Sequence, residues 1–233
     1  MREKISVAMA TYNGEKYIKE QIESILSNLS EIDELIISDD GSTDSTLDIV
    51  KSFSDGRIRI VDGPQKGVKK NFENAIIEAS GKYIFLCDQD DIWADEKVNT
   101  VLKAFEENKC PVVVHDCSIV DDNGNILSDS FFSFKKSGRG FIKNVITNTY
   151  IGCCMAFDSS LKKKILPIPE DIEMHDQWIG IIGDLNGKNC FIPDKLISYR
   201  RHESNASDCF HHYGFKKMLS NRLHLLFALI KKK

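Results

Sequence analysis

The sequence predicts an α/β fold in which a mostly parallel sheet is flanked by helices. The first observation is that short apolar segments alternate with segments of helical periodicity through the first half of the chain. Such alternation is typical of right-handed βαβ units, whose strands run parallel in one sheet. The second observation is that turn-forming or acidic residues follow several of the apolar segments, where the strands should end. This regularity extends to about Val120.

The first two strands and helices follow from this pattern. A strand is expected over residues 4–10, and a second one over residues 34–38. Between them lies a helix whose apolar residues share one face, at spacings of three and four: Ile18, Ile22, Ile25, Leu26 and Leu29. After the second strand, Ser42 or Thr43 is expected to cap a helix that carries Leu47 and Val50.

The remaining elements of the first half are predicted in the same way. Strands are expected over residues 58–61, 83–87 and 112–115. Helices are expected over residues 68–79 and 96–108, and Gly81 fits the C-terminal cap of the first of these.

The second half is less regular. The run 122–125 is a hairpin turn signal, and residues 176–185 predict a helix. Short strands are expected over residues 151–157, 191–192 and 196–199. No internal repeat or low-complexity linker interrupts the chain, so residues 1–208 are predicted to form one domain, with halves 1–120 and 121–208.

Composition places the chain among ordinary globular proteins. It has 233 residues, with 42% hydrophobic and 28% charged residues. The formal net charge of −4 gives no indication of a nucleic-acid partner. Seven cysteines without disulfide-like spacing favour a reducing cytosol, where Cys87, Cys153 and Cys154 would be buried as small apolar residues. With neither a signal-peptide pattern nor an apolar run near the ~20 residues of a membrane span, a cytoplasmic protein is expected.

The run Asp88-Gln89-Asp90-Asp91 carries the strongest chemical signal. It follows a predicted buried strand, and three carboxylates within four positions repel each other unless a cation lies nearby. Oxygen ligands of this kind suit Mg²⁺ or Mn²⁺. A solvated loop or a helix N-cap is the alternative. An EF-hand is excluded because Ile92 and Trp93 occupy positions that need a ligand and a glycine, and no dinucleotide or P-loop motif is present.

Other polar residues are expected at the same edge of the sheet. The predicted strand ends carry Thr11 and Tyr12, then Asp39 and Asp40, then the acidic run. In a parallel sheet these ends lie on one rim, where ligands bind, so they predict a pocket for a base, a ribose and a diphosphate. Downstream, His175 and Asp176 precede an apolar helix, and Arg200, Arg201 and His202 follow a strand. An N-cap and solvated cations are the alternatives for these two groups.

Taken together, these motifs resemble the family-two glycosyltransferases with GT-A fold, and the resemblance covers roughly residues 4–205. The motifs are Thr11-Tyr12-Asn13-Gly14, Asp39-Asp40-Gly41-Ser42-Thr43-Asp44, Asp88-Gln89-Asp90-Asp91-Ile92-Trp93, His175-Asp176-Gln177-Trp178 and Tyr199-Arg200-Arg201-His202. The form of the third motif is similar to bacterial, rhamnosyltransferase-like members that build surface polysaccharides. The resemblance implies a Rossmann-like GT-A domain whose first half binds the nucleotide and whose second half binds the acceptor.

The resemblance also implies roles for individual residues. Nucleotide binding is expected from Thr11, Tyr12, Asn13, Asp39, Asp40, Asp88 and Gln89. Metal binding is expected from Asp88, Asp90 and His202, with Asp90 as the direct ligand, and Asp176 would be the catalytic base. Contacts to the acceptor or the diphosphate are assigned to His175, Trp178, Arg200 and Arg201. His175 stands where many members carry Glu.

The implied activity is the metal-dependent, inverting transfer of a hexosyl or deoxyhexosyl group. The donor would be a UDP- or dTDP-linked sugar, the acceptor a hydroxyl of a glycan or lipid-linked molecule, and the cofactor Mn²⁺ or Mg²⁺. Two alternatives are a sugar-phosphate nucleotidyltransferase, which would need a glycine-rich basic loop after the first strand, and a non-catalytic nucleotide-binding or scaffold subunit.

The C-terminal segment, residues 209–233, is predicted to be a basic amphipathic helix. Its apolar residues recur at helical spacing: Phe215, Met218, Leu219, Leu223, Leu226, Phe227 and Ile230. No acidic residue follows Asp208. Such a helix would either lie on an anionic membrane surface, at the inner face of the cell membrane, or dock on the domain or a partner subunit.

Overall fold

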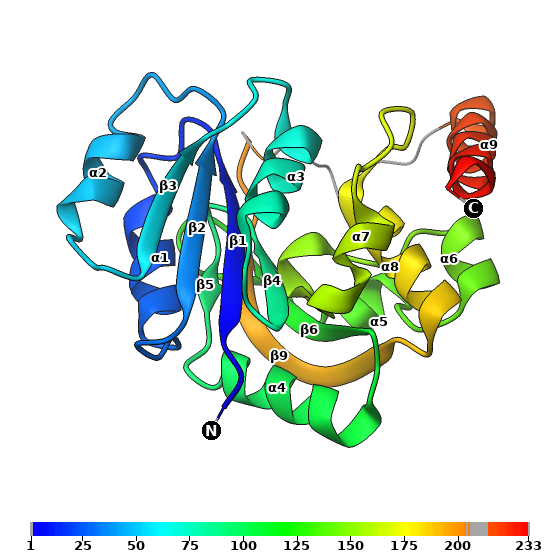
Figure 1. Cartoon of the computed structure of the whole chain (residues 1–233), viewed down its shortest axis with the longest axis horizontal. Coiled ribbons are helices and arrows are strands. Elements are labelled where there is room, and N and C mark those ends of the chain that lie inside the picture. Colours follow the sequence, from blue (N-terminus) through cyan, green and yellow to red (C-terminus); the bar gives the residue numbers. More distant parts are fainter. Residues whose placement is uncertain (1, 204, 206–213, 233) are drawn as a thin grey trace.

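The computed structural model describes residues 2–203, 205 and 214–232. Its nine strands are β1 Ile5–Thr11, β2 Glu34–Asp39, β3 Ile58–Asp62, β4 Tyr83–Cys87, β5 Ile92–Trp93, β6 Val112–Val120, β7 Ile126–Ser128, β8 Met155–Asp158 and β9 Cys190–Arg200. They form one sheet in the order β3-β2-β1-β4-β8-β6-β9-β5, and β7 pairs with β6 (Figure 1).

Helices pack against this sheet. The α-helices are α1 Ile18–Leu26, α2 Thr46–Ser52, α3 Val68–Glu78, α4 Lys97–Asn108, α5 Phe131–Lys135, α6 Phe141–Ile146, α7 Lys162–Ile165, α8 His175–Asn186 and α9 Phe215–Lys231. Two short 3-10 turns are η1 Gly152–Cys154 and η2 Ser159–Leu161. In Figure 1, α3 appears beside β1, and it contacts both β1 and β2, whereas α5 to α9 gather at the end of the molecule opposite α2.

The first half confirms the predicted parallel sheet. β1 pairs in parallel with β2 and β4, and β2 pairs in parallel with β3. Thr11 lies opposite Asp39, and Met9 lies opposite Cys87, so the ends of β1, β2 and β4 share one rim. The apolar faces predicted for the flanking helices are buried, as Ile22 of α1 and Phe72 of α3 show.

The predicted mostly parallel sheet is confirmed, and beyond β4 it also contains antiparallel pairings. β8 lies between β4 and β6 and runs antiparallel to both. It comes from the second half of the chain and brings η1 with it, because the segment 151–157, predicted as one strand, forms a 3-10 turn before the strand begins at Met155. The two short strands predicted near the end of the domain are one continuous strand, β9, which pairs in parallel with β6.

Two predicted caps are wrong. α2 begins at Thr46, and Asp44 accepts a hydrogen bond from the Thr46 N–H, so neither Ser42 nor Thr43 caps it. Gly81 does not cap α3, which ends in an extended residue. A Cβ at Gly81 would lie 2.5 Å from the backbone of Ile5, so this glycine is needed where the chain crosses β1 closely.

Several local predictions are confirmed. The hairpin turn at 122–125 joins the antiparallel strands β6 and β7, and α8 matches the predicted helix 176–185. Cys87, Cys153 and Cys154 are buried and carry free thiols. Among the described helices, none combines the length and the hydropathy that a bilayer crossing requires.

Candidate active site

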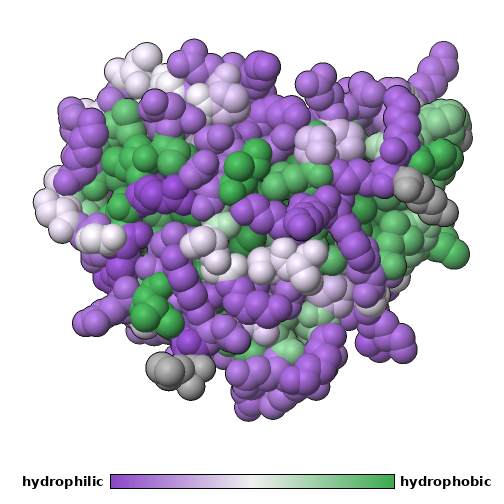
Figure 2. All heavy atoms as spheres, in the orientation of Figure 1, coloured by the Kyte–Doolittle hydropathy of each residue, from purple (hydrophilic) through white to green (hydrophobic). Residues whose placement is uncertain are grey.

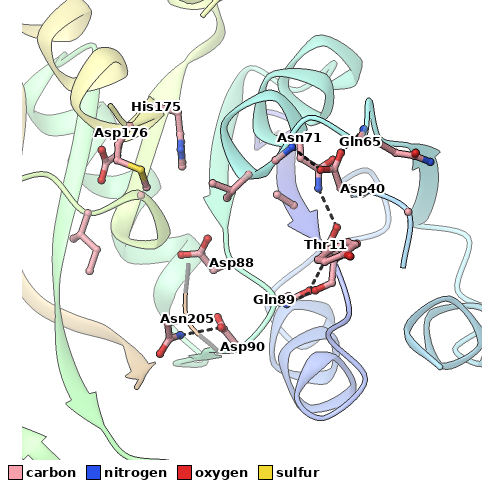
Figure 3. A pocket seen from close by; sticks show the side chains of 18 of the residues that line it. Thr11, Asp40, Gln65, Asn71, Asp88, Gln89, Asp90, His175, Asp176 and Asn205 are labelled. Atoms are coloured by element: carbon pink, nitrogen blue, oxygen red, sulfur yellow. Dashed lines mark hydrogen bonds between the residues drawn. The ribbon is translucent and has the colours of Figure 1, made fainter. Parts of the chain in front are cut away.

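A cavity of about 620 Å³ opens at the rim where β1, β2 and β4 end. Its first-half wall consists of Ala10, Thr11, Tyr12, Asp40, Gly41, Gln65, Gly67, Val68, Asn71, Asp88, Gln89 and Asp90. Its second-half wall consists of Ile151, Gly152, Met174, His175, Asp176, Tyr199 and Asn205. Figure 3 shows Asp88 between Asp176 and His175 on one side and Thr11 and Asp40 on the other.

The acidic run after β4 forms a tight cluster. Ligand atoms of Asp88, Asp91 and Cys153 all lie within 4.8 Å of one another. Burial, and then the charges of Asp90 and Asp176, raise the pKa of Asp88 to about 7. Burial, and then the charges of Asp90 and Asp88, raise the pKa of Asp91 well above its ordinary value. Carboxylates that disfavour each other's charge to this degree would be stabilised by a cation between them.

The donor set of this cluster fits a hard divalent cation. Asp91 is 1% exposed, and its Oδ2 has no hydrogen-bond partner among the described residues. Burial raises the pKa of the Cys153 thiol well above its ordinary value, so the sulfur stays protonated and is a poor ligand. The oxygen atoms of Asp88 and Asp91 are the remaining ligands, and oxygen ligands suit Mg²⁺ or Mn²⁺.

Asp90 points toward the segment that follows β9. Its Oδ2 lies 2.9 Å from His202 Nε2 and accepts a hydrogen bond from Asn205 Nδ2 at 3.1 Å. The His202 ring stacks on Tyr17, with centroids 4.5 Å apart. The structure therefore brings together Asp90 and His202, which were predicted as metal ligands from opposite ends of the domain, and adds Asn205.

Asp39 and Asp40 hold the loops of the first-half wall. Asp39 accepts hydrogen bonds from the Ser42 N–H at 2.8 Å and from Thr11 Oγ1 at 3.1 Å. The two oxygens of Asp40 accept from the backbone N–H groups of Gln65, at 2.6 Å, and Gly67, at 2.8 Å. Asp40 lines the cavity, whereas Asp39 is buried behind it and fixes the loop after β2.

Gln89 ties the loop after β1 to the acidic run. Its Oε1 accepts from the Tyr12 N–H at 2.9 Å, and its Nε2 donates to the Tyr12 carbonyl at 3.0 Å. A Cβ at Gly14 would lie 2.4 Å from Gln89 Oε1, which explains the glycine there. Asn13 lies outside the cavity and accepts from the Thr43 N–H at 2.9 Å, so it joins two loops. Tyr12 is 55% exposed and leaves its ring available at the cavity rim.

Asp176 stands in the first turn of α8, on the second-half wall. Burial raises the pKa of its carboxyl group to about 6, although hydrogen bonds from the Gln177 N–H and from Asn148 act in the opposite direction. A carboxylate with such a pKa is ionised near neutral pH and still accepts a proton readily, as a general base requires. Its charge also raises the pKa of Asp88, which shows that the two groups sense each other across the cavity.

His175 precedes Asp176 and is 3% exposed. Its ring stacks on Phe72 of α3, with centroids 4.0 Å apart, and neither ring nitrogen has a hydrogen-bond partner within the described part of the chain. Burial lowers the pKa of His175 to about 3, so the ring is neutral at physiological pH. It lines the cavity and offers one donor and one acceptor to a ligand.

Three residues predicted to contact the acceptor or the diphosphate do not line the cavity. Trp178 is a core residue that is 0% exposed, and its Nε1 donates to the Ile165 carbonyl. The Arg200 guanidinium pairs with Glu20 at 2.6 Å and lies over Tyr17, whereas Arg201 donates to the Tyr199 hydroxyl. Trp178 faces the core because it lies two residues after Asp176, on another side of α8.

The structure adds cavity residues that the sequence did not single out: Gln65, Asn71, Gly152, Met174 and Asn205. It also places Tyr199, which belongs to a predicted motif but had no assigned role, in the lining. For Asn71 the sequence offers one weak signal, which is its place next to Phe72 on the predicted helix 68–79. Asn71 lies on the face of α3 that points to β1 and donates to the Thr11 and Ser38 carbonyls. Asn205 had no signal, because its partner Asp90 lies 115 positions away in the sequence.

Known proteins are similar to this chain in sequence and in fold. A sequence profile described as "Glycosyl transferase family 2" matches residues 6–166. The dTDP-rhamnosyl transferase RfbG of Shigella flexneri is 30% identical over 226 residues, which cover 84% of this chain and 72% of that protein. The UDP-Glc:alpha-D-GlcNAc-diphosphoundecaprenol beta-1,3-glucosyltransferase WfgD of Escherichia coli is 28% identical over 87% of this chain and 79% of its own length. The chain spans 66% and 46% of the length of two further curated relatives.

Solved structures show the same fold. S. aureus TarS 1-349, in complex with UDP-GlcNAc, superposes with a TM-score of 0.71 at 23% identity, over 87% of this chain and 60% of that chain. The mannosyltransferase PcManGT from Pyrobaculum calidifontis, in complex with GDP-Man and Mn²⁺, gives a TM-score of 0.64 at 18% identity, over 100% of this chain and 65% of that one. The fold is the GT-A fold, and the chain belongs to glycosyl transferase family 2.

Proposed function

We propose that this chain is a metal-dependent, inverting glycosyltransferase. It moves a sugar from a UDP- or dTDP-linked donor to a hydroxyl group of a glycan or lipid-linked acceptor in bacterial surface polysaccharide synthesis. The observation that carries the proposal is the cavity itself, in which the acidic cluster of Asp88 faces the carboxyl group of Asp176. One side suits a metal-bound diphosphate, and the other suits a hydroxyl group that must lose a proton.

The first-half wall would bind the donor nucleotide. Tyr12 offers an exposed ring to the base, and Thr11 and Asp40 line the adjacent space. Asp88 and Asp90 would hold Mn²⁺ or Mg²⁺, with Asp91, whose ligand atom lies within 4.8 Å of that of Asp88, as a further oxygen ligand, and His202 would hold Asp90 in position. When bound, such an ion neutralises the negative charge that develops on the leaving diphosphate.

Asp176 would act as the catalytic base. The acceptor oxygen forms a bond to the anomeric carbon while the bond from that carbon to the diphosphate oxygen breaks. The acceptor proton passes to Asp176, and the nucleoside diphosphate leaves with the bonding electron pair. A single displacement from the face opposite the leaving group inverts the anomeric centre. His175 is neutral, and its ring nitrogens have no hydrogen-bond partner among the described residues. It would donate a hydrogen bond to an acceptor hydroxyl beside Asp176, or accept one from it.

The relatives support the class of reaction. By their names, RfbG uses a dTDP-linked rhamnosyl donor, and WfgD transfers glucose from UDP-Glc to a diphosphoundecaprenol-linked sugar. TarS binds UDP-GlcNAc, and PcManGT binds GDP-Man with Mn²⁺. An acceptor attached to undecaprenol lies at a membrane, so the proposal includes a position at the inner face of the cell membrane.

Thermal unfolding with nucleotides tests the donor side. UDP, dTDP, GDP and CDP are each added with and without Mn²⁺, and a ligand at about 100 times its Kd should stabilise the protein by ~2.7 kcal/mol. The expected result is a Mn²⁺-dependent rise in Tm with UDP or dTDP, followed by slow hydrolysis of the matching nucleotide sugar. A rise with nucleotide but no hydrolysis of any sugar donor would favour the scaffold subunit. No rise with any of the four would contradict the proposal.

A further inference from the structure

The helix α9 has two apolar faces. Its inner face packs on the domain through Leu225, which is 2% exposed, and Ala228, which is 9% exposed. Five further apolar residues form an outer stripe that is exposed to solvent: Leu219, Leu223, Leu226, Phe227 and Ile230, at 48%, 45%, 39%, 58% and 68% exposure. At 3.6 residues per turn, these five positions fall on the side of the helix opposite Leu225.

Specific contacts fix which face points outward. Asn221 donates to Glu173, and Arg222 donates to the Ile146 carbonyl at the end of α6. Lys232 donates to the Leu166 carbonyl at 2.5 Å. Because the middle and the C-terminal end of α9 are tied to the domain, the helix cannot rotate to bury the outer stripe without breaking these contacts.

The neighbouring helix α6 extends the apolar surface. Ile142 is 72% exposed and Ile146 is 56% exposed, and α6 contacts α9. Figure 2 shows hydrophobic side chains gathered at the edge of the molecule where α9 lies in Figure 1. We call the outer stripe together with these two isoleucines the α6–α9 surface. It is composed of residues from two segments about 75 positions apart in the sequence, joined by the Arg222 hydrogen bond across 76 positions.

Both segments are basic and contain no acidic residue. The stretch 131–150, which contains α6, carries Lys135, Lys136, Arg139 and Lys143. The stretch 214–232, which contains α9, carries Lys216, Lys217, Arg222, Lys231 and Lys232. The whole chain has a formal net charge of −4, so the two stretches that carry these exposed apolar side chains have a local excess of positive charge, and the acidic residue Glu173 contacts α9 through Asn221.

We infer that the α6–α9 surface binds an anionic lipid bilayer. An apolar stripe bordered by cations matches a helix that lies in the membrane interface, and each Lys or Arg near an anionic surface adds attraction. A second copy of the chain is the less suitable occupant. In a twofold-symmetric dimer the same face meets itself, so this surface would oppose its own cations.

The surface lies on the acceptor side of the cavity. Asn221 of α9 contacts Glu173, and Glu173 precedes Asp176 by three residues. A bilayer bound to the α6–α9 surface would therefore lie next to the second-half wall, which the proposed function assigns to the acceptor. The inference rests on the proposed function only for this use, because lipid binding requires neither donor nor acceptor.

Flotation of the full chain with vesicles tests the inference without nucleotide. We expect it to float with phosphatidylcholine vesicles that contain phosphatidylglycerol and to remain unbound with phosphatidylcholine alone. The double variant Leu223→Glu/Phe227→Glu should lose flotation. The matched control is Ile32→Glu, because Ile32 is 53% exposed in the loop between α1 and β2, and it should float like the wild type. Lys216→Gln/Lys231→Gln should weaken partitioning roughly 30-fold.

A spectroscopic readout locates the contact. Both native tryptophans are buried, at 3% for Trp93 and 0% for Trp178. In Phe227→Trp, the new indole should shift its emission to shorter wavelength on addition of the phosphatidylglycerol vesicles, and an unchanged spectrum would contradict the inference.

Two further outcomes would also overturn the inference. Undiminished flotation of the double glutamate variant is one. The other is a wild type that forms a concentration-dependent dimer and does not bind vesicles, while the double variant is monomeric, since the surface would then join two copies of the chain. The Mn²⁺-dependent Tm shift with nucleotide should persist in the double variant, which shows that it is folded. Loss of that shift in the wild type, with flotation intact, would contradict only the proposed function.

Discussion

The two walls of the cavity are built in different ways. On the first-half wall, polar side chains are bonded to the protein itself: Asp40 to two backbone N–H groups, and Gln89 to both polar backbone groups of Tyr12. On the second-half wall, His175 has no hydrogen-bond partner within the described residues, and burial shifts the pKa values of His175 and Asp176 in opposite directions.

The difference fits the proposed function, in which the first-half wall binds the donor and the second-half wall acts on the acceptor. Hydrogen bonds among the loops fix the shape of the first-half wall before any ligand arrives, which lowers the entropic cost of binding. Polar groups that remain unpaired in a buried place are instead ready to bond to a ligand. The predictions below test whether binding and chemistry divide between the walls in this way.

The largest effect is expected from Asp176→Asn. The amide cannot accept the acceptor proton, so kcat should fall by about 10²–10⁴-fold, while the Tm shift with nucleotide and Mn²⁺ stays unchanged. Steady-state transfer assays and thermal unfolding measure the two quantities. Asp184→Asn is the matched control, because Asp184 lies on the same helix outside the cavity and bonds to Tyr150. Loss of nucleotide binding in Asp176→Asn would place Asp176 in the donor site instead.

Asp90→Ala tests the first-half wall. Removing this carboxylate should eliminate the Mn²⁺-dependent part of the nucleotide stabilisation, ~2.7 kcal/mol at about 100 times the Kd. Asp91→Asn provides the comparison, because Asp91 rather than Asp90 lies beside Asp88 in the structure. If Asp90→Ala binds nucleotide with Mn²⁺ as the wild type does and Asp91→Asn does not, the metal ligand is Asp91.

Asp88→Asn should stabilise the metal-free protein. The pKa of Asp88 is raised to about 7 in the folded state, against 3.8 for the ordinary group. A raised pKa means that the folded state favours the protonated form of Asp88. The stability that the protonated carboxyl group provides is therefore fully present below about pH 4 and is lost as the pH rises through 7. At pH 8 the substitution should raise the free energy of unfolding by roughly 2–4 kcal/mol. Chemical denaturation at pH 8 and pH 4 measures it, and equal effects at both pH values would contradict the assignment.

Lys97→Met tests the connection between the walls. Lys97 is 0% exposed, its Nζ donates to the Cys153 carbonyl at 2.9 Å, and it lies 3.9 Å from the centroid of Trp93. The substitution leaves this carbonyl in η1 without its donor, so we expect a loss of roughly 1–3 kcal/mol in unfolding free energy. Lys103→Met on the exposed side of α4 is the control. An unchanged Tm for Lys97→Met would show that η1 keeps its position without the lysine.

His175→Gln should have the smallest effect on rate, and it tests whether His175 or Asp176 is the group whose ionisation controls the rate. The pKa of His175 is about 3 and that of Asp176 is about 6, so of these two groups only Asp176 changes its charge between pH 5 and 8. Asp88, with a pKa of about 7 in the metal-free protein, is expected to be ionised over this range when the cation is bound. The rate should therefore fall below about pH 6 in both the wild type and His175→Gln, while the acceptor KM of the variant rises about fivefold. A pH–rate profile measures this. Loss of the acid limb in His175→Gln would assign that limb to the histidine.

Much of the first-half wall could be predicted from the sequence alone. The strands β1, β2 and β4 are local apolar runs, and a parallel sheet places their ends on one rim, so Thr11, Asp40 and Asp88 could be placed together. The helix that carries Asp176 was equally predictable, because its apolar period is local.

The residues that face this wall could not be predicted, because they depend on contacts between distant segments. β8 inserts antiparallel between β4 and β6, and Asn205 reaches Asp90 across 115 positions. α9 turns Leu225 inward and Phe227 outward, although both are large apolar residues on one amphipathic helix. Local periodicity indicates which face of a helix or strand a residue lies on. Which residue it then contacts depends on how distant segments of the chain pack together, and on the entropic cost of closing the loops between them.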